Sequence, residues 1–91
     1  MTTIFIPTPL RRLTAGQSKV VVNGETVSGL IKALEQSHPG IAERILDETG
    51  NPKKFINIFL NEDDIYELQG LDTLVSDRDQ LSIVPALAGG A

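Results

Sequence analysis

The sequence predicts an α+β fold in which a mixed sheet of four to five strands packs on one main helix. Three observations indicate this class: a single long amphipathic helix pattern, two strand patterns before it, and further strand patterns after it. A right-handed crossover through the helix would bring the last strand beside the first in parallel and leave the helix on one face of the sheet.

Two short strands are expected at the start of the chain. Residues 3–6 are β-branched and aromatic, and Pro7 and Pro9 end any regular pairing, so a turn should follow. Residues 18–22 form the second strand, closed by Asn23-Gly24, a dipeptide that readily takes positive φ in tight turns. The pair reads as an N-terminal hairpin with a long loop.

The helix begins after Thr26, which occupies an N-cap position. An apolar stripe at i, i+3, i+4 and i+7 follows and should lie on the core; it comprises Val27, Leu30, Ile31 and Leu34. Pro39 disfavours helical geometry in the residue before it, so the helix should stop near His38. Residues 41–46 fit one more short helical segment.

Residues 55–60 are the clearest central strand, because this run contains no breaker. The side chains alternate in two rows. The aliphatic row should face the helix and the other row should face away; they are Ile56, Ile58 and Leu60, and Phe55, Asn57 and Phe59.

Shorter elements complete the order. We expect a polar turn at 61–64, a short strand at 65–67, an irregular or single-turn segment at 70–75, a charged turn at 77–79 and the last strand at 81–84. The arrangement is that of the β-grasp fold. The predicted domain covers residues 1–85, and residues 86–91 form a flexible C-terminal tail with Gly-Gly.

Composition excludes several classes of function. Ninety-one residues suffice for one domain. The formal charge of −4 opposes phosphate contacts, so we expect no nucleic-acid partner. The absence of cysteine excludes disulfides, thiolate metal sites and a cysteine nucleophile. No apolar run approaches the roughly 20 residues that span a bilayer, so we expect no membrane association and a cytoplasmic protein.

Several motifs resemble those of the MoaD/ThiS family of sulfur carriers, prokaryotic relatives of ubiquitin. They are the NGET turn into the helix, the strand-end FLN and the terminal DRDQLSIVPALAGG. The IPT-x-LR start, the FINIFLN strand and the VPALAGG end are most similar to the carrier that supplies sulfur for cysteine synthesis. The resemblance extends over essentially the whole chain.

The resemblance implies a function for the tail. A ubiquitin-activating-enzyme-like adenylyltransferase would use ATP and magnesium to activate the carboxyl group of Gly90, and a sulfur donor would then convert it to a thiocarboxylate. Leu87, Ala88 and Gly89 would thread into the partner, because glycine lacks a Cβ and the last charged side chain precedes residue 80. No catalytic residue, metal or cofactor of the chain's own is implied. Ala91 departs from the pattern, and we expect a peptidase, of the metal-dependent kind, to remove it.

The row facing away from the helix is the expected docking surface for partner enzymes. Phe59, Asn57 and Val84 belong to it, and Leu87 is expected beside it. The alternative is a solvated sheet face with some apolar residues. His38 reads as a helix-end residue, and the acidic run 62–64 reads as a solvated turn, because it lacks the spaced ligands of a calcium loop.

Three functions remain open at this point. The first is sulfur transfer to biosynthesis, with a cysteine-synthase-like acceptor preferred to a molybdopterin-synthase-like one and to thiamine synthesis. The second is a ubiquitin-like modifier joined to lysines of target proteins through Gly90. The third is a binding module without chemistry, in which the tail is inert.

Overall fold

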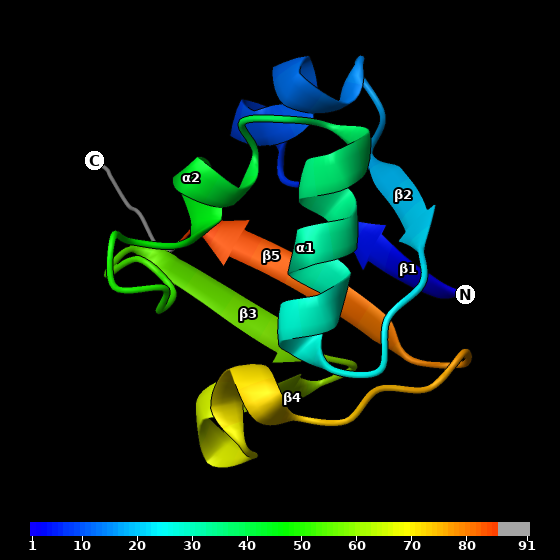
Figure 1. The fold of residues 1–91 in the computed structure, drawn as a ribbon, viewed down its shortest axis with the longest axis vertical. Helices are drawn as coiled ribbons and strands as arrows, with labels where there is room; N and C mark the ends of the chain where they lie inside the picture. Colours follow the sequence, from blue (N-terminus) through cyan, green and yellow to red (C-terminus); the bar gives the residue numbers. More distant parts are fainter. Residues whose placement is uncertain (86–91) are drawn as a thin grey trace.

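A five-stranded mixed sheet covered on one face by a long helix makes up the chain (Figure 1). The computed structural model describes residues 1–85. The strands are β1 (Thr2–Phe5), β2 (Lys19–Val22), β3 (Ile56–Leu60), β4 (Asp63–Asp64) and β5 (Gln80–Pro85). The helices are α1 (Val27–Ser37), the short α2 (Ala42–Ile45) and three 3₁₀ helices, η1 (Thr8–Thr14), η2 (Ile65–Glu67) and η3 (Gly70–Asp72).

The sheet has the order β2-β1-β5-β3-β4, with the first and last strands adjacent at its centre. β1 pairs with β2 in antiparallel and with β5 in parallel, whereas β3 pairs with both β5 and β4 in antiparallel. The predicted β-grasp arrangement, including the parallel pairing through the α1 crossover, is therefore confirmed.

The N-terminus of α1 begins where the sequence predicts it. The Thr26 hydroxyl oxygen accepts a hydrogen bond from the Gly29 backbone N–H at 3.0 Å, which satisfies one of the unpaired donors of the first turn. All four residues of the apolar stripe are buried. They pack on the inner face of the sheet, whose buried residues are Ile4, Val20, Val22, Ile58, Leu60, Leu81 and Ile83.

A carboxylate joins the end of α1 to α2. Glu35 accepts hydrogen bonds from the backbone N–H groups of Gly40, at 3.0 and 3.1 Å, and Ala42, at 2.9 Å. These bonds, that from Gly40 first and then that from Ala42, lower the pKa of Glu35. Gly40 has a φ of 99°, which other residues rarely adopt. The short helix expected within 41–46 thus exists, and Glu35 fixes the approach to it.

The expected strand at residues 65–67 is wrong. This segment is η2, and the strand that pairs with β3 is β4, inside the predicted turn. The Asp64 carboxylate accepts from the Tyr66 backbone N–H at 2.9 Å and closes a local turn, while Ile65 alone is buried. Local capping outweighs the β-propensity of the Ile-Tyr pair.

Two details of the N-terminal half also differ from expectation. The loop after β1 contains η1, because Leu10 is buried and the Arg11 Nε donates to the Ile6 carbonyl at 3.1 Å. Gly24 is not at positive φ. A Cβ on Gly24 would lie 2.8 Å from the Leu30 backbone nitrogen, so close packing against α1, rather than turn conformation, requires this glycine.

Within residues 1–85, no helix combines the length and the apolar character that crossing a membrane would need.

Candidate functional site

The sheet face turned away from α1 is the first candidate site, and we call it the open face. Alternation along the strands places the predicted docking residues there: Phe59 lies opposite Ser82, and Asn57 lies opposite Val84. The neighbouring strand adds Phe5, which lies opposite Ser82 from the other side. The structure therefore brings the three predicted residues together.

Aromatic residues distinguish the open face from the core. None of the chain's three phenylalanines is among the buried core residues. Phe5 and Phe59 flank Ser82 on the open face, and Phe55, which is 65% exposed, directly precedes β3. Val84 remains 41% exposed in the middle of the sheet. Exposed aromatic and aliphatic groups on one face are typical of protein-binding surfaces.

Sequence reasoning missed Phe5. The signal was available, because Phe5 lies between Ile4 and Ile6, both buried, and alternation assigns it to the opposite face. Its neighbour across β2 is Lys19, whose Nζ lies 5.7 Å from the centre of the Phe5 ring.

The open face adjoins the point where the chain leaves the sheet. Pro85, the last residue of β5, lies opposite Ile56, the first residue of β3. The residues predicted to thread, carry sulfur and be processed lie outside the described residues; they are Leu87, Ala88, Gly89, Gly90 and Ala91. What the structure contributes is the surface from which they start.

The start of β5 is held by a polar network around Asn61. Asn61 has a φ of 58°, its Nδ2 donates to the Asp79 carboxylate at 3.1 Å, and its Oδ1 accepts from the Gln80 backbone N–H at 3.1 Å. The Asn61 backbone N–H donates to the Gln80 carbonyl at 2.8 Å. Asp79 also accepts from the Ser76 N–H at 2.8 Å.

These hydrogen bonds have an electrostatic consequence and a geometric one. The side-chain bond from Asn61, followed by the backbone bond from Ser76, lowers the pKa of Asp79. They also fix the register of β5 against β3, on which the position of Val84 and of the chain exit depends. The FLN and DRDQ motifs thus act together across the sheet.

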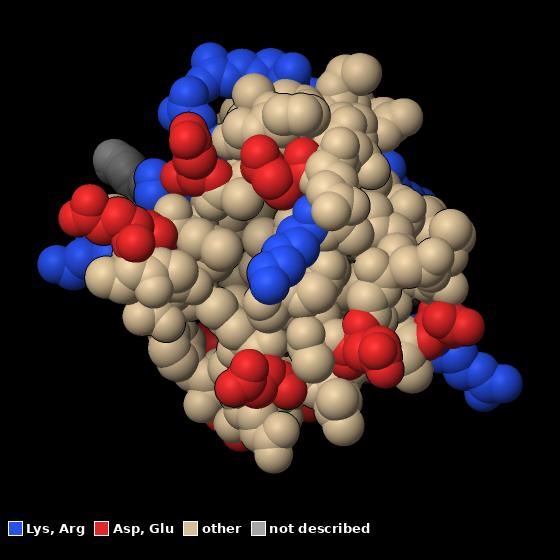
Figure 2. All heavy atoms as spheres, viewed as in Figure 1, with Lys and Arg blue, Asp and Glu red and all other residues tan. Residues whose placement is uncertain are grey.

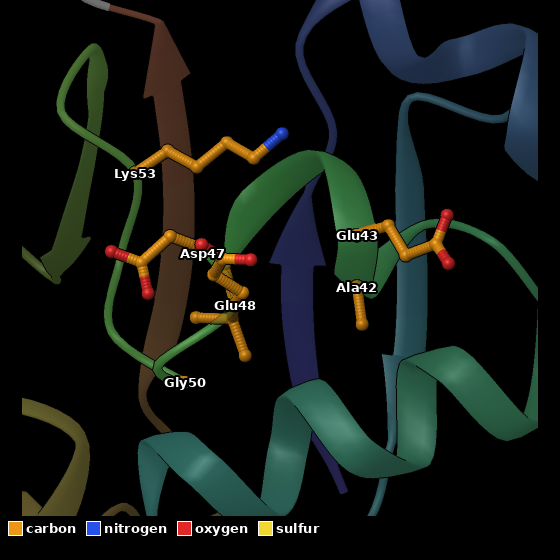
Figure 3. A pocket seen from close by; sticks show the side chains of 7 residues that line it. Ala42, Glu43, Asp47, Glu48, Gly50 and Lys53 are labelled. Carbon is orange, nitrogen blue, oxygen red and sulfur yellow. The ribbon is translucent and has the colours of Figure 1, made fainter.

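A hollow beside α2 is the second candidate. Ala42 and Leu46 are its apolar lining residues. Glu43, Glu48 and Lys53 also line it (Figure 3). Its remaining carboxylate, that of Asp47, is already engaged.

The Asp47 carboxylate accepts from the hydroxyl and backbone N–H of Thr49 and from the Asn51 backbone N–H. The Thr49 hydroxyl is the largest cause of the lowered pKa of Asp47. In the part of the chain that the structure describes, no group of three histidine or acidic side chains is placed to hold a metal ion. The hydrogen bonds of Asp47 therefore stabilise the loop beside the hollow.

Comparisons with known proteins agree with this geometry. The sequence profile of the ThiS family matches residues 4–90. The sulfur carrier protein CysO of Mycobacterium tuberculosis is 41% identical over 90 residues, which is 97% of each chain. A chain in the crystal structure of the Amycolatopsis orientalis BexX/CysO complex superposes with a TM-score of 0.93 at 40% identity, over 99% of this chain and all of that one.

A relative named as a modifier protein is also similar. Small archaeal modifier protein 3 of Haloferax volcanii is 30% identical over 82 residues, covering 87% of this chain and 88% of its own. The fold, the open face and the sequence matches lead to one conclusion: the chain belongs to the ThiS family of ubiquitin-like β-grasp proteins.

Proposed function

We propose that this chain is a sulfur carrier whose Gly90 carboxyl group is adenylated and converted to a thiocarboxylate. The observation that carries the proposal is the family match, whose last matched residue is Gly90. The 41% identity to a sulfur carrier protein over 97% of the chain supports it. In this function the chain is a substrate of other enzymes and not itself a catalyst.

The chemistry requires activation because a carboxylate is anionic, resonance-stabilised and therefore a poor electrophile. An adenylyltransferase joins the Gly90 carboxylate to AMP from ATP, with magnesium, and releases pyrophosphate. Hydrosulfide then displaces AMP to give the thiocarboxylate. A persulfide donor gives an acyl disulfide instead, whose S–S bond a thiol cleaves to leave the thiocarboxylate.

The folded body would supply recognition, and residues 86–90 would supply reach. Four residues separate Pro85 from Gly90, so five Cα-to-Cα steps join them. Fully extended, five steps span at most about 18 Å. A partner that grips the open face beside Val84 can thus hold the reactive carbonyl in a cleft within that distance. A CysO chain, to which this chain is similar, was crystallised in a complex with BexX, which supports the proposal that the folded body docks on a partner protein.

We propose further that the peptide bond between Gly90 and Ala91 is cleaved before activation. With the bond intact, Gly90 has no free carboxylate to adenylate. A methyl group on the terminal residue would also obstruct a channel shaped for glycine. A metal-dependent peptidase is the enzyme class that we assign to this step.

For the acceptor, similarity to CysO carriers favours an enzyme of the cysteine-synthase kind over a molybdopterin-synthase-like one. The identity of neighbouring genes in the native genome tests this preference. A gene for a cysteine-synthase-like enzyme supports it, and genes for molybdopterin or thiazole synthesis contradict it.

The decisive experiment uses three forms of the chain: one ending at Gly90, the full chain with Ala91, and the Gly90-ended chain carrying Gly90→Ala. Each is incubated with the host adenylyltransferase, ATP, magnesium and sulfide, and its intact mass is measured. We expect only the first form to gain the mass of sulfur in place of oxygen. Equal conversion of the full chain would overturn the processing step, and no conversion of any form would overturn the carrier function.

A protein modifier is the second candidate, favoured by the 30% identity to small archaeal modifier protein 3. It uses the same adenylate but transfers Gly90 to a lysine amine. Immunoblots of native extracts distinguish the two, because a modifier produces isopeptide-linked species of higher mass and a carrier remains a free monomer.

A further inference from the structure

Charge is distributed very unevenly over this acidic chain. Residues 61–79 contain seven Asp and Glu residues and one basic residue, Arg78. This segment includes β4, η2 and η3 and ends where β5 begins. In Figure 2 acidic side chains lie along the lower margin, below α1, but others lie among the basic side chains at the upper left, and a basic side chain projects at the lower right.

Of the eight Lys and Arg residues, five belong to segments that meet at the end of the sheet where β5 finishes. We call this group the basic collar, and it comprises Arg11, Lys19, Arg44, Lys53 and Lys54.

Strand pairing and loop contacts place the collar around Pro85. Lys53 and Lys54 closely precede Ile56, which lies opposite Pro85. The Lys53 backbone N–H donates to the carbonyl of Ile45, the residue after Arg44, at 2.8 Å.

The other two collar residues are linked to β1, which runs parallel to β5. Lys19 pairs with Phe5, which pairs with Ser82 of β5. Arg11 is tied to the carbonyl of Ile6, the residue that follows β1, at 3.1 Å. The collar thus covers both sides of the chain exit.

Within residues 1–85 the collar cations have no ion-pair partner. The only ion pair joins the Met1 amino group to Asp77 at 2.9 Å, at the opposite end of the sheet. Carboxylates share the collar end: Glu43, Asp47 and Glu48 line the hollow beside α2 together with the collar residue Lys53 (Figure 3). Glu35 is also close to α2, but its carboxylate accepts hydrogen bonds from the Gly40 and Ala42 backbone N–H groups. That of Asp47 is occupied by hydrogen bonds within its own loop.

Two of the collar cations lie close to the rings of exposed or half-exposed phenylalanines. The Lys19 Nζ lies 5.7 Å from the Phe5 ring centre, and the Lys54 Nζ lies 6.0 Å from that of Phe55. Phe5 on β1 and Phe59 on β3 both lie opposite Ser82 of β5, the strand between them. Lys19, which lies opposite Phe5 on β2, therefore extends the open face with a positive charge. A surface that combines aromatic anchors with a charged rim is typical of protein interfaces.

We propose that the basic collar docks on an acidic rim around the cleft of the adenylyltransferase that activates Gly90. The collar attracts that rim while residues 61–79 are repelled by it, so the approaching chain is oriented with its β5 end towards the partner. This inference rests on the proposed function, since it assigns a partner surface to the same tail. Rim charges of this kind change association rates more than they change final affinity.

The test uses the chain ending at Gly90 and the host adenylyltransferase. K53E/K54E reverses two exposed collar charges, and K32E/R78E reverses two charges elsewhere with the same change in net charge. Both variants are first checked for unchanged thermal unfolding. Pyrophosphate release then gives kcat/KM at low and at high ionic strength, because charges interact over only about 3 Å in 1 M salt.

We expect K53E/K54E to lower kcat/KM roughly tenfold or more at low ionic strength, with most of the loss removed by salt, and K32E/R78E to lower it much less. K53Q/K54Q should lie between the wild type and the reversal. Equal effects of the two double reversals, or no effect of either, would overturn the collar and leave the carrier function intact. A wild-type chain that is never adenylated would instead overturn the proposed function, and this inference with it.

Discussion

Replacing Asn61 tests the network that sets the register of β5. Substitution can separate two properties of this residue. One is its pair of side-chain hydrogen bonds, to Asp79 and Gln80, and the other is its left-handed backbone conformation, with a φ of 58°. Asn61→Gly removes the bonds but accepts the φ. Asn61→Ala removes the bonds and adds the steric cost of the left-handed region.

The expected magnitudes follow from the geometry. Both hydrogen bonds are solvent-exposed and 3.1 Å long, so each should contribute near the lower end of the usual range, about 0.5 kcal/mol. Asn61→Gly should therefore lower the free energy of unfolding by about 1 kcal/mol. Asn61→Ala adds about 1–2 kcal/mol, because its Cβ crowds the following carbonyl in that conformation. Each kcal/mol corresponds to a Tm shift of about 4–8 °C for a domain of this size.

Urea unfolding provides the assay, and an NMR titration of the Asp79 carboxyl group provides an independent one. Loss of the Asn61 side chain should raise the pKa of Asp79 from its lowered value in both variants. The ordering is the sharp result, since alanine is ordinarily the better tolerated of the two residues. An Ala variant as stable as the Gly variant would refute the backbone reasoning, and an unchanged Asp79 pKa would refute the network.

Three further perturbations address other parts of the chain. Gly24→Ala should lower the free energy of unfolding by about 1–3 kcal/mol, because its Cβ would lie 2.8 Å from a backbone nitrogen. Gly29→Ala, whose Cβ would have its nearest contact at 3.4 Å, should raise it by up to about 1 kcal/mol through helix propensity. Urea midpoints that move in the same direction for both variants would contradict this. Val84→Asp should lower kcat/KM for adenylation at least about tenfold, because it places a charge on the open face. The matched control Leu74→Asp, at a site that is 72% exposed, should change kcat/KM little. Equal kcat/KM values for the two variants would exclude the open face as the docking surface. The pKa of Glu35 is lowered in the folded chain, so its contribution to stability is complete above the unfolded-state pKa of glutamate and is lost as pH falls through the folded-state pKa. The Tm difference between wild type and Glu35→Gln should therefore shrink in acid. A Tm difference that does not change with pH would refute this role of Glu35.

Local patterns were sufficient for the parts of the fold that depend on one segment at a time. The apolar stripe of α1 and its Thr26 cap predicted the helix, and the alternation in residues 55–60 predicted which side of β3 faces it. The resemblance of the motifs predicted the family, and the profile match confirms it. These succeed because helical and strand periodicities are short-range properties of the sequence.

Tertiary structure decided what depends on segments distant in sequence. The strand at 65–67 failed because Asp64 caps a 3₁₀ turn there, and Gly24 is required by its contact with α1 rather than by its own φ. Alternation between Ile4 and Ile6 could have assigned Phe5 to the open face, but the register of the parallel β1–β5 pairing that sets it opposite Ser82 is seen only in the structure. The basic collar likewise depends on that pairing, because cations from widely separated segments meet only where strands β1, β3 and β5 reach the same end of the sheet. The sequence alone determined the family, because its motifs are local, and packing decided which side chains meet on the open face, because that depends on strand pairing between distant segments.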